Sequence, residues 1–357
     1  MNATALAAPL LALAVFAPTA SSPAPEPIEL AWRLAEGEQF LVTTDMAMET
    51  TTTTMGEPQV QSTENRSTRL VVVEEVDDAG NMHLAISVQA FAMVQGSEDM
   101  DLDLTAERDE DGDVVVSAVI DSDNPMLNDG EMQRFFEAFG ENLLELTFEM
   151  VVTPQGKVLK ATVDRDPFVG LPDDSPVLAM TLKALEVMIS AEDLPEIAAG
   201  EMFLQLSPEP VEPGDDWTVV RAMNVAGFGL SGSGSTRFES LERDGETAVA
   251  LLVESTDYEI ETDGMSEKLD ELMRAIFESM ELEMETSTDL QGDDFSVESR
   301  IEFDVAGGFA RQVVWEGQTI EVSGTMEVGD QSMEMEIVTE VSRSSASWER
   351  VEADEED

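Results

Sequence analysis

The sequence contains no cysteine, and its 357 residues include one histidine, His83, and one tyrosine. Without cysteine the chain cannot form a disulfide, use a thiol as a nucleophile, or bind zinc or an iron–sulfur cluster through sulfur. A single histidine also excludes any metal or proton-transfer site built from two histidines. These absences remove several common catalytic chemistries, and we expect no bound cofactor.

Basic residues are also scarce. Lys and Arg number 18 against 77 Asp and Glu, which gives a formal net charge of −59. Such a field repels the phosphate backbone of nucleic acids, so a nucleic-acid partner is not expected. Hydrophobic residues still make up 42% of the chain, enough for a sizeable core, so the acidity indicates a hydrated surface and not disorder. The alternative is that the protein is an acidic structural or cation-binding component of the envelope or matrix, in which the carboxylates themselves carry the function.

The first residues have the pattern of a secretory signal peptide. Residues 3–17 are almost wholly apolar, and small residues and prolines follow as far as Pro27. The apolar run is too short, and too interrupted by Pro9 and Pro18, to be a stable membrane span. We therefore predict a signal peptide over 1–22 and a proline-rich leader over 23–27. The mature chain should then be exported, periplasmic or extracellular, soluble, and without a transmembrane segment.

Apolar and polar residues alternate along much of the remaining chain. Residues 40–48, 84–90 and 297–305 follow this pattern, and so do 320–326 and 333–337, which Gly329-Asp330 joins through a turn. Alternation of this kind gives a strand one dry face and one wet face. The pattern is typical of antiparallel sheets that are covered on one side.

Three segments instead have apolar residues at helical spacing. They cover 132–146, 178–189 and 269–280, and each follows a candidate N-cap residue, namely Asn128, Ser175 and Ser266. We expect these helices to pack their apolar stripes against the sheet.

Several landmarks occur twice in the same order, which indicates a tandem duplication. In each half a glycine turn precedes an aromatic residue, at Gly37 and Phe40 and again at Gly214, Asp215 and Trp217. A helix then leads to a hairpin, turned at Gly156 in the first half and at Gly308 in the second. We interpret these seven residues as structural, with a positive φ at the turn glycines.

The predicted fold class is therefore α+β. It consists of two tandem antiparallel β-sheet modules, each a curved sheet or half-barrel with a packed helix. The modules span residues 28–170 and 201–349, a helical connector spans 171–200, and an acidic tail spans 350–357.

The candidates for chemistry are few. Asp109, Asp111 and Asp113 lie around Gly112 as in a calcium loop, but Ala118 stands where a bidentate Glu belongs, so a plain turn explains them and no metal site is assigned. No catalytic motif of the serine hydrolase, nucleotide-binding or zinc protease type occurs, and no catalytic residue is assigned. The glycine-rich run 227–234 is interpreted as a flexible hairpin linker. An enzyme is therefore less expected than a binding protein, with a carboxylate-based hydrolase as the third alternative.

Methionine is unusually abundant, with 21 residues, many of them on predicted strand faces or helix stripes. Methionine adapts to irregular apolar partners. We therefore predict a non-catalytic binding protein that holds an apolar small molecule or lipid, or an envelope protein, on a Met-rich sheet face.

The chain resembles a family of exported bacterial proteins of unknown function. The resemblance rests on the Gly214-Asp215-x-Trp217 turn, the strand end at residues 119–122 and the hairpin Pro154-x-Gly156-x-Val158-Leu159. It implies secretion and β-rich modules, and it brings no catalytic residues with it. At the level of fold alone, a long antiparallel sheet over helices is similar to the half-barrel of periplasmic lipoprotein carriers.

Overall fold

The computed structural model describes residues 27–98, 100–109, 112–122, 129–188, 194–225, 228–245, 247–279, 285–329 and 331–351. Strands account for 61% of the structure and helices for 17%. The strands of the first half are β1 (Gln39–Thr54), β2 (Glu57–Val76), β3 (Met82–Ser97), β4 (Met100–Arg108), β5 (Val114–Ser122), β6 (Thr147–Val152) and β7 (Val158–Val163). Those of the second half are β8 (Asp216–Val225), β9 (Phe228–Asp244), β10 (Thr247–Glu261), β11 (Thr286–Gly292), β12 (Phe295–Asp304), β13 (Phe309–Trp315), β14 (Gln318–Val328) and β15 (Gln331–Arg350). The helices are α1 (Asp129–Leu144), α2 (Pro176–Met188), α3 (Leu194–Met202) and α4 (Thr262–Ser279).

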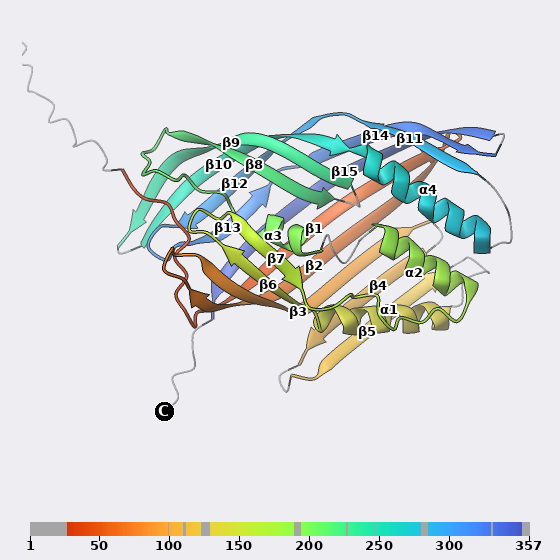
Figure 1. Ribbon diagram of the computed structural model, residues 1–357, viewed down its shortest axis with the longest axis horizontal. Helices are drawn as coiled ribbons and strands as arrows, with labels where there is room; N and C mark the ends of the chain where they lie inside the picture. The colour runs from red at the N-terminus through yellow and green to blue at the C-terminus, as the bar shows by residue number, and fades with distance from the viewer. Residues whose placement is uncertain are drawn as a thin grey trace, which may run out of the picture.

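These strands form one antiparallel sheet (Figure 1). Its main path runs β5-β4-β3-β2-β1-β15-β13-β12-β10-β9-β8. At its centre β1 pairs with β15, from Phe40 opposite Arg350 to Thr54 opposite Met335. The prediction of an α+β fold with two tandem sheet modules is therefore wrong. The alternation of residues specifies the dry face of each strand, but it does not specify which strand lies beside it, and backbone pairing between β1 and β15 merges the two halves.

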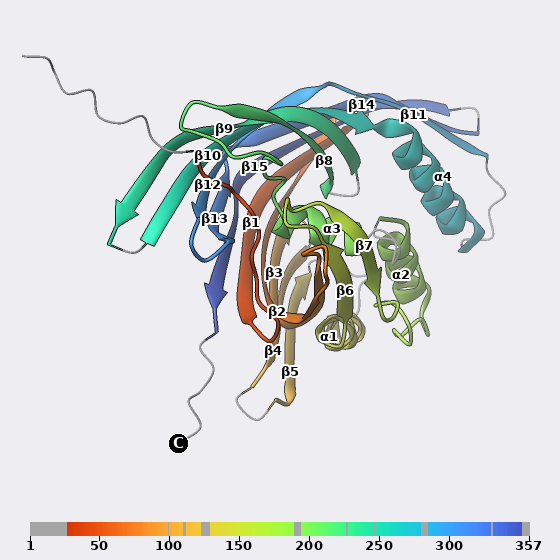
Figure 2. The ribbon, with the colours of Figure 1, turned by 60° about the vertical axis from the view of Figure 1, so that its left-hand side comes forward.

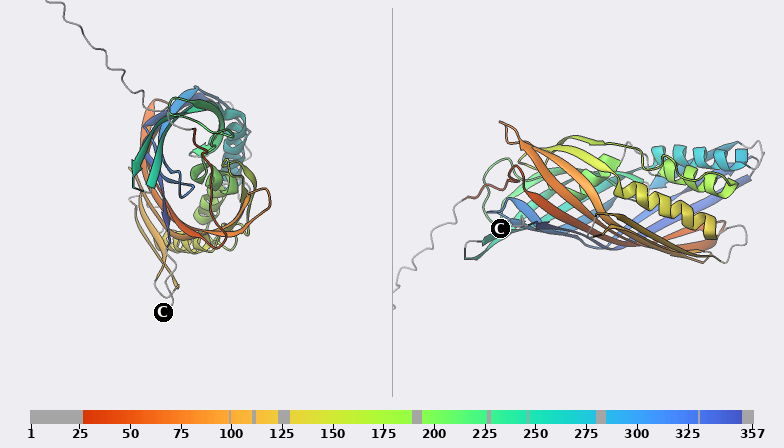
Figure 3. Two further views of the ribbon diagram at one scale, coloured as in Figure 1. Left: turned by 90° about the vertical axis from the view of Figure 1, so that its left-hand side faces the viewer. Right: turned by 90° about the horizontal axis from the view of Figure 1, so that it is seen from below.

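The sheet divides at two of its strands. Along β3, residues 82–87 pair with β6 and residues 90–96 pair with β4. Along β15, residues 344–347 pair with β13 and residues 331–341 pair with β14. One end of the sheet curls round strongly, as Figure 2 and the left panel of Figure 3 show, and this curl brings β7 toward β8. The described residues give β7 and β8 one paired neighbour each, so each presents a backbone edge.

The core lies on the concave side of the sheet. On β12, Val297, Ile301 and Phe303 are buried, whereas Glu298 and Glu302 on the opposite face are exposed. In the curled end, a cluster of aromatic rings fills the concave side: Trp32, Phe40, Phe203, Phe303 and Trp348. The ring centroids of Trp32 and Phe203 are 5.2 Å apart, in the edge-on arrangement that aromatic pairs favour.

Helices α1, α2 and α4 lie together at the other end of the molecule (Figures 1 and 3). On α1, the buried Phe135 and Phe139 pack against Leu102 and Leu104 of β4. Leu178 on α2 is buried in the same cluster. These contacts agree with the expectation that the apolar stripes face the sheet.

The helix starts follow the sequence at one place and depart from it at another. The Oγ of Ser175 accepts a hydrogen bond from the N–H of Leu178 at 3.3 Å, as an N-cap does, and α2 begins at the next residue. Helix α4 begins at Thr262, four residues before the predicted Ser266. The Oγ of Ser266 instead accepts a hydrogen bond from the N–H of Leu290 at 3.3 Å, which ties α4 to β11. The predicted cap Asn128 lies outside the described residues.

The glycine-rich run is part of a strand and not a linker. Residues 228–234 belong to β9, while 226 and 227 lie outside the described residues. A Cβ on Gly234 would overlap the carbonyl oxygen of Ser255, and one on Gly232 would lie 2.7 Å from the ring of Tyr258. The glycines therefore let β10 approach closely.

Candidate functional site

A cavity of about 670 Å³ lies where the edges of β7 and β8 approach each other. Its walls come from the start of β7, from α3, from β8 and β9, and from the first turns of α4. The apolar part of the lining includes Val158, Ala161, Ile197, Phe203, Leu230 and Met265. The size is that of a site for a small molecule.

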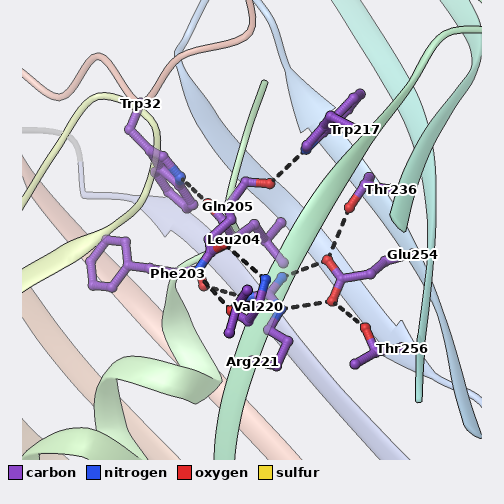
Figure 4. A network of polar contacts seen from close by, with 10 residues as sticks. All are labelled: Trp32, Phe203, Leu204, Gln205, Trp217, Val220, Arg221, Thr236, Glu254 and Thr256. Atoms are coloured by element: carbon purple, nitrogen blue, oxygen red, sulfur yellow. Dashed lines mark hydrogen bonds and ion pairs between the residues drawn. The ribbon is translucent and has the colours of Figure 1, made fainter. Parts of the chain in front are cut away.

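A buried ion pair forms part of the wall (Figure 4). Arg221 of β8 donates from Nε and from a terminal nitrogen to the two carboxylate oxygens of Glu254 on β10, at 2.7 and 2.6 Å. The side chains are 11% and 5% exposed. Thr236 and Thr256 also donate their hydroxyls to this carboxylate, at 3.2 and 3.3 Å. The bidentate geometry and the extra donors satisfy a charge that would otherwise be costly to bury.

The ion pair changes the proton affinities around it. Burial by itself would lower the pKa of Arg221, but the charge of Glu254 and its hydrogen bonds outweigh burial and raise the pKa. The pKa of the nearby Tyr258 is raised to about 12, mainly by burial; the charge of Arg221 opposes the rise and that of Glu254 adds to it. Arg221 therefore stays charged and Tyr258 stays neutral across the physiological range.

Three consecutive carbonyls that follow α3 are fixed by long side chains (Figure 4). The carbonyl of Phe203 accepts from Arg221 at 2.9 Å, that of Leu204 from the indole of Trp32 at 3.1 Å, and that of Gln205 from the indole of Trp217 at 3.0 Å. The end of a helix leaves such carbonyls without partners inside the helix. These bonds hold residues 203–205 in place beside the cavity.

The side chain of Gln205 covers part of the exposed edge of β8. Its amide donates to the carbonyl of Val220 at 2.7 Å and accepts from the N–H of Val220 at 3.1 Å. A primary amide carries one donor face and one acceptor, so it reproduces the two bonds that a neighbouring strand would make. Gln205 therefore satisfies the backbone of β8 at Val220 while leaving the adjacent part of the edge to the cavity.

The predicted glycine turns have the same hydrogen bonds in both halves. Gly37 has φ +84° and donates to the carbonyl of Val73 at 2.8 Å, while Gly214 has φ +105° and donates to the carbonyl of Phe238 at 2.7 Å. The carboxylates that follow them, Glu38 and Asp215, each accept from the N–H three residues before, at 2.7 and 2.8 Å. The positive φ is the one that the turn prediction requires. The tandem duplication and its module boundaries stay predictions, because two matching turns do not test them.

The aromatic residues that follow these turns have different surroundings. Phe40 is fully buried in the aromatic cluster, at 0% exposure. Trp217 is 9% exposed and takes part in the wall network through its indole. The sequence thus identified Trp217 without indicating its place beside the cavity.

The two hairpin glycines, Gly156 and Gly308, lie close to the segment that contains Trp32 and Arg33. Gly156 has φ +77°, and a Cβ there would overlap the carbonyl oxygen of Leu204. Gly308 has φ +68°, and its carbonyl accepts from the N–H of Arg33 at 3.0 Å. Gly156 lines the cavity, whereas Gly308 lies in the turn between β12 and β13 and does not line it.

The candidate calcium loop closes the β4–β5 hairpin. Asp109 accepts from the N–H of Asp113 at 2.9 Å through its side chain, and its carbonyl accepts from Gly112 at 3.0 Å. Asp111 lies outside the described residues. These are the hydrogen bonds of a tight turn. Among the described residues, no cluster of His, Asp or Glu is arranged to hold a metal ion.

Most of the methionines that the structure describes lie away from the cavity. Met46, Met48 and Met335 pack against the core beneath α4, and Met93 and Met132 pack around α1. They fill the space between sheet and helices, as adaptable side chains do. The cavity takes its methionine from Met265 at the start of α4.

Sequence reasoning missed Arg221, Glu254 and the lysines of the lining. A signal for the first two was present. Arg221 alternates with Trp217 and Val219 on the dry face of β8, and Glu254 falls on the dry face of β10 between Leu252 and Tyr258. A charged residue in such a position needs a buried partner of opposite charge.

No protein family's sequence profile matches this chain, and no curated protein matches it. Among solved structures, an outer membrane channel from Pseudomonas putida is 10% identical over 91% of this chain and 100% of the channel, with a TM-score of 0.19. OpdL from Pseudomonas aeruginosa is 8% identical over 89% of this chain and 100% of its own, with a TM-score of 0.18. OpdQ from the same organism is 7% identical over the same shares, with a TM-score of 0.18.

The first of these neighbours is an outer membrane channel, and the prediction of a soluble exported protein is withdrawn. At TM-scores this low the matches put no other location or activity in its place. Within the described ranges, none of the helices is both long enough and apolar enough to cross a bilayer. The case for the function of this chain therefore rests on its own residues.

Proposed function

We propose that this protein is a non-catalytic binding protein that holds a small, largely apolar molecule in the cavity between β7 and β8. The observation that supports the proposal is the cavity itself, with about 670 Å³ and walls that are mainly apolar. Binding sites for small molecules have this size, an apolar lining and a few fixed polar groups.

The fixed walls favour binding over chemistry. The ion pair of Arg221 and Glu254 is saturated with hydrogen bonds, and residues 203–205 are held by two indoles and a guanidinium. Groups with satisfied partners and stable charge states are suited to shaping a site, whereas a general acid or base needs a pKa near the working pH. The polar groups of the wall therefore keep the cavity open and rigid.

A neutral fluorescent probe tests the proposal. N-phenyl-1-naphthylamine should bind saturably and become brighter, because it moves from water into an apolar site. Gly264→Trp should lower the affinity by about tenfold or more, since Gly264 lines the cavity and a side chain there has open space in which to occupy it.

Glu267→Trp is the matched control. Glu267 is exposed on the same helix, three residues from Gly264, and does not line the cavity. The control should bind the probe like the unmodified protein, and melting curves should show that both variants fold. Probe binding that does not saturate, or that is equal in the two variants, contradicts the proposal.

A further inference from the structure

We infer that the cavity selects an amphipathic anion, a molecule with an apolar body and a carboxylate or phosphate group; this inference rests on the binding function proposed above. The chain has four lysines, Lys157, Lys160, Lys183 and Lys268, and three of them line the cavity. Arg221 is a further basic residue of the lining.

The charge of the lining is the reverse of that of the chain. Four basic residues and one acidic residue, Glu261, line the cavity, whereas the whole sequence has 18 basic and 77 acidic residues. Among the described residues, three elements that are far apart in the sequence supply the lysines and the arginine: β7 with the hairpin before it, β8, and α4. The fold thus gathers scarce positive charge at one place.

Each basic group of the lining has a different role. Arg221 is neutralised by Glu254 and shapes the wall. Lys160 makes an ion pair with Glu149 at 3.7 Å, but both side chains are more than half exposed, so the pair is weak and leaves the lysine able to bind a ligand. Lys157 is exposed at the rim, and Lys268 is half-buried on α4. The apolar residues Leu230, Met265 and Phe203 lie in the same lining and would contact the body of the ligand.

The electrostatic field of the whole protein opposes the binding of anions, which provides a test of the proposed anion preference. A net charge of −59 attracts cations and repels anions over the surface at large. An amphiphile that adheres non-specifically should therefore bind best when it is cationic. A preference for the anion can come only from the local charge of the cavity, because the long-range field opposes it.

The first experiment compares amphiphiles of equal chain length in displacing N-phenyl-1-naphthylamine, each below its micelle concentration at pH 7.5. We expect dodecanoate or dodecyl phosphate to displace the probe at a concentration about tenfold lower than dodecanol, since hydrogen bonds to charged groups are worth about that much. Dodecyltrimethylammonium should displace it least well. The ratio of dodecanoate to dodecyl phosphate distinguishes a carboxylate ligand from a phosphate ligand.

The second experiment removes the charges one at a time. Lys157→Gln and Lys268→Gln should each weaken dodecanoate binding, together by about tenfold, while dodecanol binding changes little. Lys183→Gln is the matched control. Lys183 pairs with Glu271 of α4 at 2.7 Å and does not line the cavity, so its loss should change dodecanoate affinity by less than about twofold.

The outcomes separate this inference from the proposed function. If dodecanol and dodecanoate displace the probe equally, or if the ammonium compound is best, the anion preference is overturned while the apolar cavity stands. If all lysine variants, including Lys183→Gln, weaken binding alike, the local role of the lining lysines is also overturned. If the probe and every amphiphile fail to bind, the proposed function fails too.

Discussion

Replacing Glu254 by glutamine should destabilise the protein strongly. Glutamine has nearly the same shape and can still bond to Thr236 and Thr256, but it leaves the guanidinium of Arg221 buried without a counter-charge. Arg221 is 11% exposed and directs three nitrogens at Glu254 and at the carbonyl of Phe203, so little of its guanidinium is left for water to solvate. Removing one partner of a buried ion pair costs about 3–5 kcal/mol of unfolding free energy.

The measurement is urea unfolding followed by circular dichroism in the far ultraviolet, extrapolated to water. The pair of Arg300 and Glu316 is the control, with an N–O distance of 3.0 Å and side chains that are 66% and 51% exposed. Glu316→Gln should cost at most about 1 kcal/mol, because water screens an exposed pair. The double variant Arg221→Met with Glu254→Gln should recover at least about 2 kcal/mol relative to Glu254→Gln alone, since no charge is then buried.

Two results would refute this reasoning. If Glu254→Gln costs no more than Glu316→Gln, the guanidinium is not dependent on its buried partner. If the double variant is less stable than Glu254→Gln by itself, the loss comes from packing or hydrogen bonds and not from an isolated charge.

Three further perturbations have outcomes that the structure predicts. Gly156→Ala should lower the unfolding free energy by well over the roughly 1–2 kcal/mol expected from Gly56→Ala. Both glycines have positive φ, but only a Cβ at position 156 would overlap a neighbouring backbone. Thermal melting of the two variants measures the difference. Burial would raise the pKa of Asp304, but hydrogen bonds and the nearby Arg311 outweigh burial and lower the pKa below 3.8. The ionised form of Asp304 therefore stabilises the protein at neutral pH, and this contribution is lost as the pH falls through the lowered pKa. Asp304→Asn should therefore be less stable at pH 7, and in urea titrations its difference from the unmodified protein should narrow as the pH falls below 3.8; a difference that does not change with pH would contradict the assignment. Gln205→Ala should speed hydrogen exchange at the N–H of Val220, because water replaces the amide that now protects it, and unchanged exchange would show that Gln205 does not cover this edge.

The local features of this fold could be read from the sequence because they depend on neighbouring residues. Alternation placed the dry face of β12 correctly at Val297, Ile301 and Phe303. Ser175 capped α2 as expected, and Gly37 and Gly214 have the positive φ that their turns need. Each of these depends on the steric and hydrogen-bonding preferences of a few adjacent residues.

The pairing of strands could not be read in the same way. The register of β1 against β15 joins residues nearly 300 positions apart, and the alternation in either strand is compatible with many partners. The cavity was missed for the same reason. Lys157, Arg221 and Lys268 carry no motif and lie on three separate elements, so only the curl of the sheet brings them together.

The pairing of β1 with β15 also constrains how the chain can fold. The second strand of this central pair leaves the ribosome about 300 residues after the first, so β1 must wait for Arg350 and its neighbours before one of its two edges is filled. Contacts across so long a loop form slowly. During synthesis β1 has β2 alone beside it, and its uncovered edge is a place where a chaperone, or another nascent copy, would bind first.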